Sequence, residues 1–409
     1  MSIRKDHRVR ADGSVPWIVD YRDGEGNRRH KTFKTKKEAA DWDARTRVQV
    51  QEGTHVPDRA TITVKDAGKL WIQTCRSNGL ERTTIEAYEG HLKYHINPAI
   101  GHVLLSKVTV PFMREFEDTL RQGERSPAMI KRVVGSVGSL LVDSQERGLV
   151  VHNAVRDMRS QRKGKQRRQE QRHKEPIKAG KDYPTPDEMR AFLGVLKGRW
   201  RVLFRTAVFC GPRSSELRGL RWPNVDLSER EIDVQERADR FDEMGPPKSK
   251  NGRRKLPVPA GLAQELREWK LVCPKVATEQ RDANGNPVMV LDRVFPNGKG
   301  NGESHGNIIN RGLIPAMIAA GITVDTGKRD KDGKPILAAK YTGLHALRHF
   351  YASWCINPVS RGGMGLSPKE VQIRMGHASI AMTLDTYGHL FPKGDTTSEV
   401  DAAERALLG

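Results

Sequence analysis

The chain has 409 residues and a formal charge of +21, because 71 Lys and Arg residues outnumber 50 Asp and Glu residues. This length predicts two or three domains, and a hydrophobic content of 36% excludes a wholly disordered chain. The longest uncharged apolar stretch, around Leu313 to Val324, is shorter than the roughly 18 residues that a membrane-spanning helix needs. The first residues show no signal-peptide pattern. The excess charge therefore predicts a polyanionic partner, either a nucleic acid or an anionic membrane surface.

The four cysteines are Cys75, Cys210, Cys273 and Cys355, which lie far apart in the sequence. They form no C-x-x-C pair and no Cys/His spacing typical of zinc. We therefore expect buried, reduced thiols in a cytoplasmic protein, with no metal and no cofactor.

Residues 1–58 are predicted to form a small domain with a three-stranded sheet and one helix. Trp17 to Phe33 has the pattern of a strand, a turn and a returning strand, and Thr35 with Glu38 forms a T-x-x-E capping box that begins a helix. Four basic residues here are candidate DNA contacts, namely Arg28, Arg29, Lys31 and Lys34. The alternative is a sheet that only packs against a neighbouring part of the protein.

Residues 62–158 are predicted to form a helical bundle. Thr63 can cap its first helix, and Ser126 followed by Pro127 begins a long one that Gly148 ends. This long helix carries apolar residues at helical spacing, which we assign to the core: Ile130, Val133, Val134, Val137, Leu140 and Leu141.

Residues 159–183 form a basic segment with almost no apolar residues, which is typical of a linker. We expect it to cross a phosphate backbone through five cations: Arg162, Lys163, Lys165, Arg167 and Arg168. The alternative is a solvated linker without a partner.

Residues 184–409 carry six candidate catalytic residues, each of which would be unremarkable alone. Arg213 lies in a G-P-R-S-S-E turn, and Lys248 lies in a basic loop that also holds Lys250. His345 and Arg348 form an H-x-x-R box, whose spacing places both on one face of a helix. The remaining two are His377, which follows a glycine, and Tyr387, ten residues further on.

In this order and in these contexts, the six residues resemble the tyrosine recombinase (phage integrase) family. The resemblance covers roughly Ile62 to Pro392, and the N-terminal sheet resembles the arm-site-binding module that many integrases add. It implies a multidomain α+β protein in which residues 1–58 bind arm sites and 62–158 bind the core site. The catalytic domain, 184–409, is expected to be mainly α-helical with a small antiparallel sheet and a C-terminal tail helix.

The residue types also fit this chemistry on physical grounds. Breaking and rejoining DNA without a metal or ATP requires a side-chain nucleophile that stores the phosphodiester energy covalently, which the oxygen of Tyr387 can do. Because a tyrosine pKa near 10 leaves only about one hydroxyl in a thousand ionised at pH 7, the nucleophile needs help. The guanidiniums of Arg213 and Arg348 can bind the non-bridging phosphate oxygens.

The resemblance further implies that Lys248 is the general acid for the departing 5′-oxygen, with Lys250 of the same loop as the alternative. It implies that His345 assists proton transfer from Tyr387 and that His377 donates a hydrogen bond to the phosphate. Glu216 is expected to orient Arg213 or a neighbouring helix. His349 and His389 match no catalytic position of the motif and are interpreted as packing or phosphate-contact residues.

We therefore predict a site-specific recombinase, the integrase of a phage or an integrative element. By resemblance, it acts as a homotetramer on core sites and arm sites through a Holliday junction, in the cytoplasm on the nucleoid. An excisionase and a DNA-bending host protein are possible further partners. The alternatives are a catalytically silent DNA-binding regulator or architectural protein of the same fold, and a type IB topoisomerase.

Three further features of the catalytic domain are a proline, a hairpin and a C-terminal helix. Pro212 stands where a small or apolar residue usually precedes the arginine, and it is expected to stiffen the turn. Residues 326–335 have the pattern of a basic hairpin, either a solvent-exposed loop or an extra contact with DNA or a subunit. Residues 396–409 have the pattern of a short amphipathic helix, which packs either on its own chain or on a neighbouring subunit.

Overall fold

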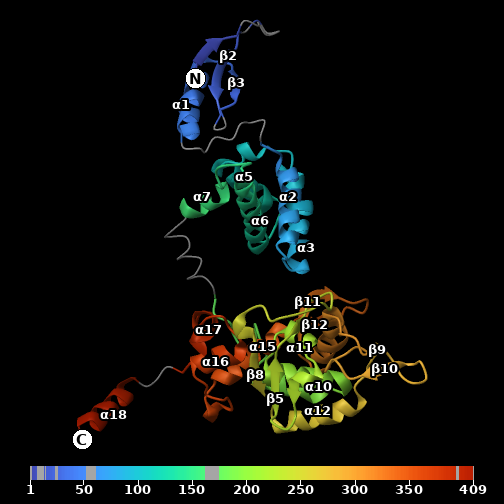
Figure 1. Cartoon of the computed structure of the whole chain (residues 1–409). Helices are drawn as coiled ribbons and strands as arrows, with labels where there is room; N and C mark the ends of the chain where they lie inside the picture. The colour runs from blue at the N-terminus through green and yellow to red at the C-terminus, as the bar shows by residue number, and fades with distance from the viewer. Residues whose placement is uncertain are drawn as a thin grey trace. The chain divides into compact units, whose positions relative to one another are not determined.

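The computed structural model describes residues 2–6, 13, 15–23, 26–51, 61–161, 175–392 and 396–408. The chain divides into two compact units, residues 1–173 and 174–409 (Figure 1). Among the described residues, no helix has the length and apolar character needed to cross a membrane. All four cysteines are buried and unpaired, as the sequence predicts.

The N-terminal sheet is antiparallel, in the order β1 (Ser2–Lys5), β2 (Trp17–Arg22), β3 (Arg28–Phe33), and α1 (Lys36–Gln51) packs against it. The predicted capping box is present, because Thr35 and Glu38 each accept a hydrogen bond from the other's backbone N–H over 3.2 Å. Trp42 of α1 packs edge-on against Tyr21 at 5.0 Å between ring centroids. The prediction of a three-stranded sheet with one helix is confirmed.

The second part of the first unit is a helical bundle. Its main helices are α2 (Val64–Ser77), α3 (Arg82–His91), α5 (Val110–Gln122), α6 (Pro127–Glu146) and α7 (Ala154–Gln161). A π-helical turn, Leu92–Ile96, joins α3 to the short α4 (Asn97–Ile100). Thr63 and Ser126 cap α2 and α6 as predicted, and the six predicted core residues of α6 are all buried.

The second unit is mainly helical. Its helices are α9 (Pro186–Val195), α10 (Gly198–Cys210), α11 (Ser214–Gly219), α12 (Ala260–Val272), α13 (His305–Asn307), α14 (Ile314–Ala319), α15 (Leu344–Ile356), α16 (Pro368–Met375), α17 (Ile380–Tyr387) and α18 (Thr396–Leu408). Helix α10 packs against both α12 and α15 at the centre of this unit. The helix predicted for the C-terminal tail is therefore present as α18.

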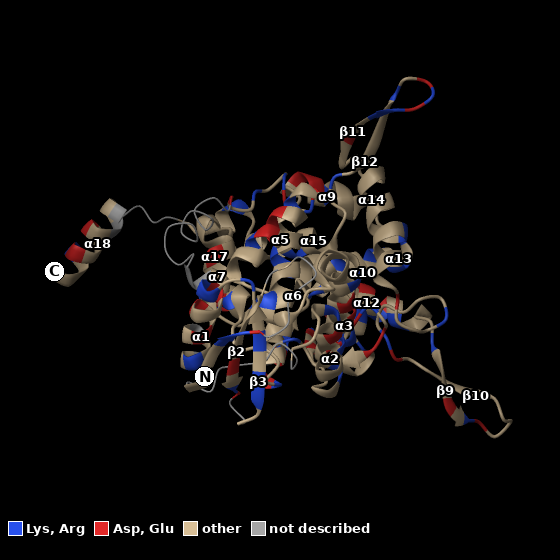
Figure 2. Cartoon of the chain, turned by 90° about the horizontal axis from the view of Figure 1, so that it is seen from above, with Lys and Arg blue, Asp and Glu red and all other residues tan. Residues whose placement is uncertain are grey.

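The strands of the second unit form small antiparallel sheets. They are β4 (Val225–Asp226), β5 (Glu231–Val234), β6 (Arg237–Ala238), β7 (Met244–Gly245), β8 (Arg254–Pro257), β9 (Val276–Arg281), β10 (Pro287–Val290), β11 (Thr323–Arg329) and β12 (Pro335–Ala339). The sheet β4-β5-β8 joins the main core, whereas the hairpins β9-β10 and β11-β12 project from it (Figures 1 and 2). The hairpin β11-β12 is the one predicted around residues 326–335.

Two apolar clusters support the candidate site in this unit. The larger one surrounds α10 and includes Phe204, Leu217 and Leu347. The smaller one lies between α15, α16 and α17 and contains Tyr351, Cys355, Val371, Met375 and Tyr387. The predicted nucleophile is thus part of a packed core.

The structure describes only the two ends of the predicted linker, residues 159–183. Helix α7 extends to Gln161, and Ala179 pairs with Tyr183 at the start of the second unit. Residues 162–174 lie outside the described residues, and with them Arg162, Lys163, Lys165, Arg167 and Arg168, so their predicted DNA contacts remain predictions.

Candidate active site

Arg213 stands in a sharp turn between two helices. Helix α10 ends at Cys210, and Gly211 adopts a left-handed conformation with φ of 63°. A Cβ atom at Gly211 would lie 2.0 Å from the Tyr351 ring, so only glycine fits here. Pro212 follows, and Arg213 then precedes α11 with extended backbone angles. Pro212 therefore fits the turn without displacing the arginine.

Glu216 binds two arginines at once. Arg213 donates to one carboxylate oxygen from Nη1 over 2.8 Å and to the other from its backbone N–H over 2.7 Å. Arg254, at the start of β8, donates to the same two oxygens over 3.1 and 2.8 Å. Burial raises the pKa of Glu216, but the hydrogen bonds and charges of Arg254 and Arg213 outweigh it and lower the pKa to about 2. Glu216 thus holds Arg213 through both of its carboxylate oxygens.

Arg254 was not predicted from the sequence. Its guanidinium is buried and also donates to the backbone carbonyls of Arg374 and Gly252. Nothing in its local sequence, Gly252-Arg253-Arg254-Lys255, distinguishes it from its basic neighbours. Only the structure separates Arg254 from these neighbours. Residues along β8 alternate between buried and exposed, and Arg254 and Leu256 are on the buried face.

Arg348 lies on α15, deep beneath the surface. It donates to the backbone carbonyl oxygens of Gly211 and Met375, and so connects the Arg213 turn to the end of α16. Burial, followed by the nearby charges of Arg213 and Arg254, lowers the pKa of Arg348. A phosphate bound nearby would offset this unfavourable charge concentration.

His377 follows the left-handed cap of α16 at Gly376, whose φ is 59°. The carbonyl oxygen of Gly376 accepts a 2.7 Å hydrogen bond from Arg213, so this turn touches the arginine directly. The Nδ1 atom of His377 lies 2.9 Å from the hydroxyl of Thr383. Burial, then the charges of Arg348 and Arg213, lowers the pKa of His377 to about 4, so the ring is neutral at pH 7.

Tyr387 is the last residue of α17, and only 2% of it is exposed. Its ring stacks on that of His377, with centroids 6.2 Å apart and planes 6° from parallel. Its hydroxyl lies 2.8 Å from Nδ1 of His349, whereas no hydrogen bond joins it to His345, the residue predicted to assist its proton transfer. Burial raises the pKa of Tyr387 to about 12, although Arg348 lowers it in part.

His345 is exposed on the first turn of α15. Its ring packs edge-on against His349, with centroids 4.3 Å apart. Although part of the side chain is exposed, partial desolvation of its ring, followed by the charges of Arg348 and Arg213, lowers its pKa. It therefore adjoins both the arginines and the residue that contacts Tyr387.

Lys248 is exposed in the loop between β7 and β8, and its amine makes no hydrogen bond or ion pair with a described residue. The side chain of Lys250 is not among those described. The loop is nevertheless fixed to the site, because the side-chain amide of Asn251 donates to the carbonyls of His377 and Ala378 over 3.2 and 3.1 Å. The structure therefore brings five of the six predicted residues together and leaves the amine of Lys248 in solvent.

The centre of the site carries excess positive charge. Arg213, Arg254 and Arg348 surround a single carboxylate, that of Glu216. Among the described residues, no cluster of His, Cys, Asp and Glu could hold a metal ion. Guanidiniums thus supply the positive charge near the tyrosine, which suits an anion such as a phosphodiester.

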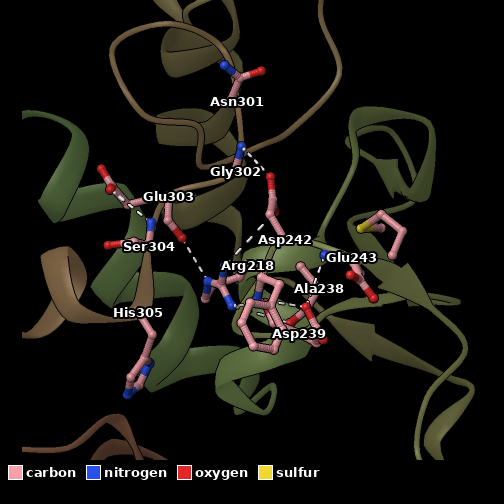
Figure 3. A network of polar contacts seen from close by, with 12 residues as sticks. Arg218, Ala238, Asp239, Asp242, Glu243, Asn301, Gly302, Glu303, Ser304 and His305 are labelled. Atoms are coloured by element: carbon pink, nitrogen blue, oxygen red, sulfur yellow. Dashed lines mark hydrogen bonds and ion pairs between the residues drawn. The ribbon is translucent and has the colours of Figure 1, made fainter. Parts of the chain in front are cut away.

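A polar network holds a second loop against α11 (Figure 3). Buried Arg218 donates to the carbonyls of Glu303 and Asp239 over 2.7 and 2.5 Å, and the backbone N–H of Gly302 donates to Asp242 over 3.2 Å. As a result, Nδ1 of His305 lies 2.9 Å from the hydroxyl of Ser214, the residue after Arg213. His305 was not predictable from the sequence, because this contact spans distant parts of the chain.

The predicted DNA contacts of the N-terminal sheet divide between its two faces. Lys and Arg occupy much of β3 (Figure 2), where exposed Arg28 alternates with half-buried Arg29 and Lys31. Arg29 forms a 2.9 Å ion pair with Asp23, and the amine of Lys31 lies 5.1 Å from the Trp42 ring of α1. Lys34 is exposed beyond the strand.

Comparison with known proteins agrees with this arrangement. Residues 183–393 match the phage integrase family, and residues 63–121 match the SAM-like N-terminal domain of phage integrases. The chain belongs to the phage integrase family. It is a tyrosine-type, site-specific DNA recombinase.

Several curated recombinases resemble the chain. A XerC-like tyrosine recombinase of Caldanaerobacter subterraneus subsp. tengcongensis is 25% identical over 396 residues, 92% of each chain. The ICEBs1 integrase of Bacillus subtilis is 22% identical over 405 residues, 96% of each chain. The transposase from transposon Tn916 of Enterococcus faecalis is 29% identical over 185 residues, 44% of this recombinase and 39% of the transposase.

Solved structures share the fold. The Tn1549 transposon integrase, in complex with transposon right end DNA, has a TM-score of 0.60 at 18% identity and covers 85% of this chain and 100% of its own. A lambda integrase tetramer bound to a Holliday junction has a TM-score of 0.52 at 16% identity. The match covers 91% of this chain and 95% of the lambda integrase chain. At these identities the likeness shows the fold alone.

Proposed function

We propose that this recombinase cuts and rejoins duplex DNA through a 3′-phosphotyrosyl bond to Tyr387, and that it integrates and excises a mobile element. The observation that carries the proposal is the packing of Tyr387 in the same folded unit as Arg213 and Arg348. Its mobile-element setting is supported by the likeness to the ICEBs1 integrase and the Tn916 transposase.

In this mechanism, the Tyr387 oxygen attacks the scissile phosphorus and the bond to the 5′-oxygen breaks. Arg213 and Arg348 bind the non-bridging oxygens, on which negative charge accumulates, and the loss of one such donor costs on the order of 10² to 10³ in rate. His377 donates a hydrogen bond to the phosphate, and His345 assists the proton transfer from Tyr387. Lys248 gives a proton to the departing 5′-oxygen, and a 5′-hydroxyl of the partner strand later reverses the reaction.

The described positions of Tyr387 and Lys248 differ from those that attack on a phosphate requires. Tyr387 is almost fully buried, while Lys248 is exposed in its loop. Cleavage therefore requires the tyrosine hydroxyl to meet the phosphate and the lysine to reach the leaving oxygen. The contacts of Asn251 with the His377 turn hold the lysine loop against the site.

We infer that the partners are DNA core sites bound by residues 62–158 and the catalytic unit, and arm sites bound by the N-terminal sheet. The lambda tetramer on a Holliday junction supports assembly of four copies on DNA. The apolar residues of α18, Val400, Leu407 and Leu408, are exposed and available for docking in this assembly. We further propose that an excisionase and a DNA-bending host protein are partners of the recombinase. It would act on the nucleoid in the host cytoplasm.

The proposal is tested with nicked duplexes that tile the DNA flanking the gene, because attachment sites usually lie beside an integrase gene. A nick near the scissile phosphate lets the short end diffuse away and traps the covalent intermediate. The wild type should form a protease-sensitive DNA adduct, whereas Tyr387→Phe should bind the same DNA without forming one. A regulator of the same fold would give no adduct, and a type IB topoisomerase would relax plasmids that lack the site.

A further inference from the structure

His349 contacts the proposed nucleophile more directly than any residue predicted from the sequence. It follows Arg348 on α15, and its Nδ1 atom lies 2.8 Å from the hydroxyl of Tyr387. The two rings meet edge to face, with centroids 5.7 Å apart and planes at 61°. This geometry is that of a well-formed hydrogen bond between the two side chains.

Both groups are neutral at pH 7, so the tautomer of His349 decides which of them donates. Burial, followed by the charges of His345 and Arg348, lowers the pKa of His349 to about 4, so its imidazole is neutral at pH 7. Burial raises the pKa of Tyr387 to about 12, so the phenol keeps its proton. When the ring proton of His349 lies on Nε2, its Nδ1 atom accepts a hydrogen bond from the Tyr387 hydroxyl.

Packing on both sides fixes the direction of this hydrogen bond. His345 packs edge-on against one side of the His349 ring, and His377 stacks on the Tyr387 ring. Since Tyr387 ends α17 and is 2% exposed, its ring has little freedom to turn away. The hydroxyl hydrogen is consequently directed at His349, and the oxygen lone pairs are directed elsewhere.

We propose that His349 positions the nucleophile by accepting the hydrogen bond of the Tyr387 hydroxyl, which leaves the oxygen lone pairs free to face the phosphate. This inference rests on the proposed function of Tyr387. His345, which packs against the ring of His349, keeps its proposed role in proton transfer. The simpler role, satisfying a buried hydroxyl, would affect stability without affecting the rate of attack.

Two substitutions separate positioning from packing. His349→Asn places an amide oxygen two bonds from Cβ, where Nδ1 stands, and can accept the same hydrogen bond. His349→Gln places its polar atoms one bond further out, near the position of Nε2, and serves as the matched control. Single-turnover formation of the covalent adduct is measured for both variants on the nicked duplex that traps wild-type protein.

We expect His349→Gln to slow adduct formation by about 10- to 100-fold, a typical cost of misplacing a reacting group, and His349→Asn to stay within about fivefold of the wild type. Equal rates for Asn and Gln, or a faster Gln variant, would overturn the inference. DNA affinity of each variant, measured in the Tyr387→Phe background, should match that of Tyr387→Phe alone. If the wild type itself forms no adduct, the proposed function of Tyr387 fails. That result is distinct from equal rates of adduct formation in the two His349 variants, which would overturn only the role of His349.

Discussion

Arg254 donates one hydrogen bond to each carboxylate oxygen of Glu216, over 3.1 and 2.8 Å. Both side chains are almost completely buried, at 3% and 2% exposure. Because the same carboxylate also holds Arg213, the position of a proposed catalytic arginine depends on a pair that never needs to touch DNA. This pair joins β8 to the turn that begins α11.

Glu216→Gln should destabilise the catalytic unit by about 3 to 5 kcal/mol, because it leaves the buried charge of Arg254 uncompensated. The free energy of unfolding in urea measures this loss. Glu231→Gln is the matched control, since Glu231 pairs with Lys255 at the surface, where 38% and 68% of the side chains are exposed. That substitution should cost no more than about 1 kcal/mol. Equal costs would show that the buried pair has no special role.

Arg254→Lys should keep most of the stability and lose activity. A lysine preserves the charge but offers no planar pair of donors to Glu216, so Arg213 loses part of its support. We expect adduct formation to slow by about 10-fold or more. A rate equal to that of the wild type would mean that Glu216 and the Gly376 carbonyl hold Arg213 without the support of Arg254.

The free energy of unfolding should decrease in two steps as the pH falls. The pKa of His377 is lowered from 6.5 to about 4, so the unfolded chain takes up its proton first and the folded state loses stability as the pH falls from 6.5 to 4. Glu216, with its pKa lowered from 4.5 to about 2, contributes stability above pH 4.5 that is lost as the pH falls toward 2. His377→Asn can keep the contact with Thr383 and removes the contribution of His377 to the first step, whereas His349, with its pKa also lowered to about 4, still contributes.

The measurement is the difference in unfolding free energy between the wild type and His377→Asn at several pH values. The wild type should lose stability relative to the variant between pH 6.5 and 4. A difference that does not change with pH would contradict the burial of a neutral His377.

A sulfur leaving group should distinguish Lys248 from Lys250. A substrate with sulfur in place of the bridging 5′-oxygen releases a thiolate, whose conjugate acid has a pKa near 8.5 by analogy with cysteine and needs no general acid. If Lys248 is the acid, Lys248→Ala should slow cleavage of ordinary DNA by about 10² to 10⁴ and be rescued on the sulfur substrate. Rescue of Lys250→Ala in its place would transfer the role to Lys250.

The pleat of β3 predicts which cations of the N-terminal sheet meet DNA. Arg28→Ala should weaken binding to arm-site DNA and lower the slope of log affinity against log salt by about one, as expected for a lost phosphate contact. Arg29→Ala should leave the slope nearly unchanged, because Arg29 pairs with Asp23. Salt titrations of the two variants are compared with those of the wild type, and a larger effect of Arg29 would reverse the assignment of the faces.

Local patterns were sufficient to predict much of this structure. The caps at Thr35, Thr63 and Ser126 depend only on residues within one helical turn, and all three are present. The order of Arg213, Arg348, His377 and Tyr387 was recognisable because each lies in a short motif. The structure brings these four together through α11, α15, α16 and α17.

Contacts between distant segments were not predictable in the same way. Arg254 reaches Glu216 across 38 residues, and the contact of His349 with Tyr387 spans another 38. In each case the sequence around the basic residue contains other basic residues. Only the packing of β8 or α15 shows which of them makes the contact. Likewise, the motif assigns His345 to proton transfer from Tyr387. In the structure, His349, one helical turn further along α15, lies beside the Tyr387 hydroxyl.

The most direct test of the central claim is the identity of the residue that becomes linked to DNA. Trypsin should release the adduct as a peptide covering residues 375–393, in which Tyr387 is the single tyrosine. Mass spectrometry of the wild-type adduct is predicted to find this peptide joined to a 3′-phosphate. Attachment to a different peptide, or an adduct that still forms with Tyr387→Phe, would contradict the account.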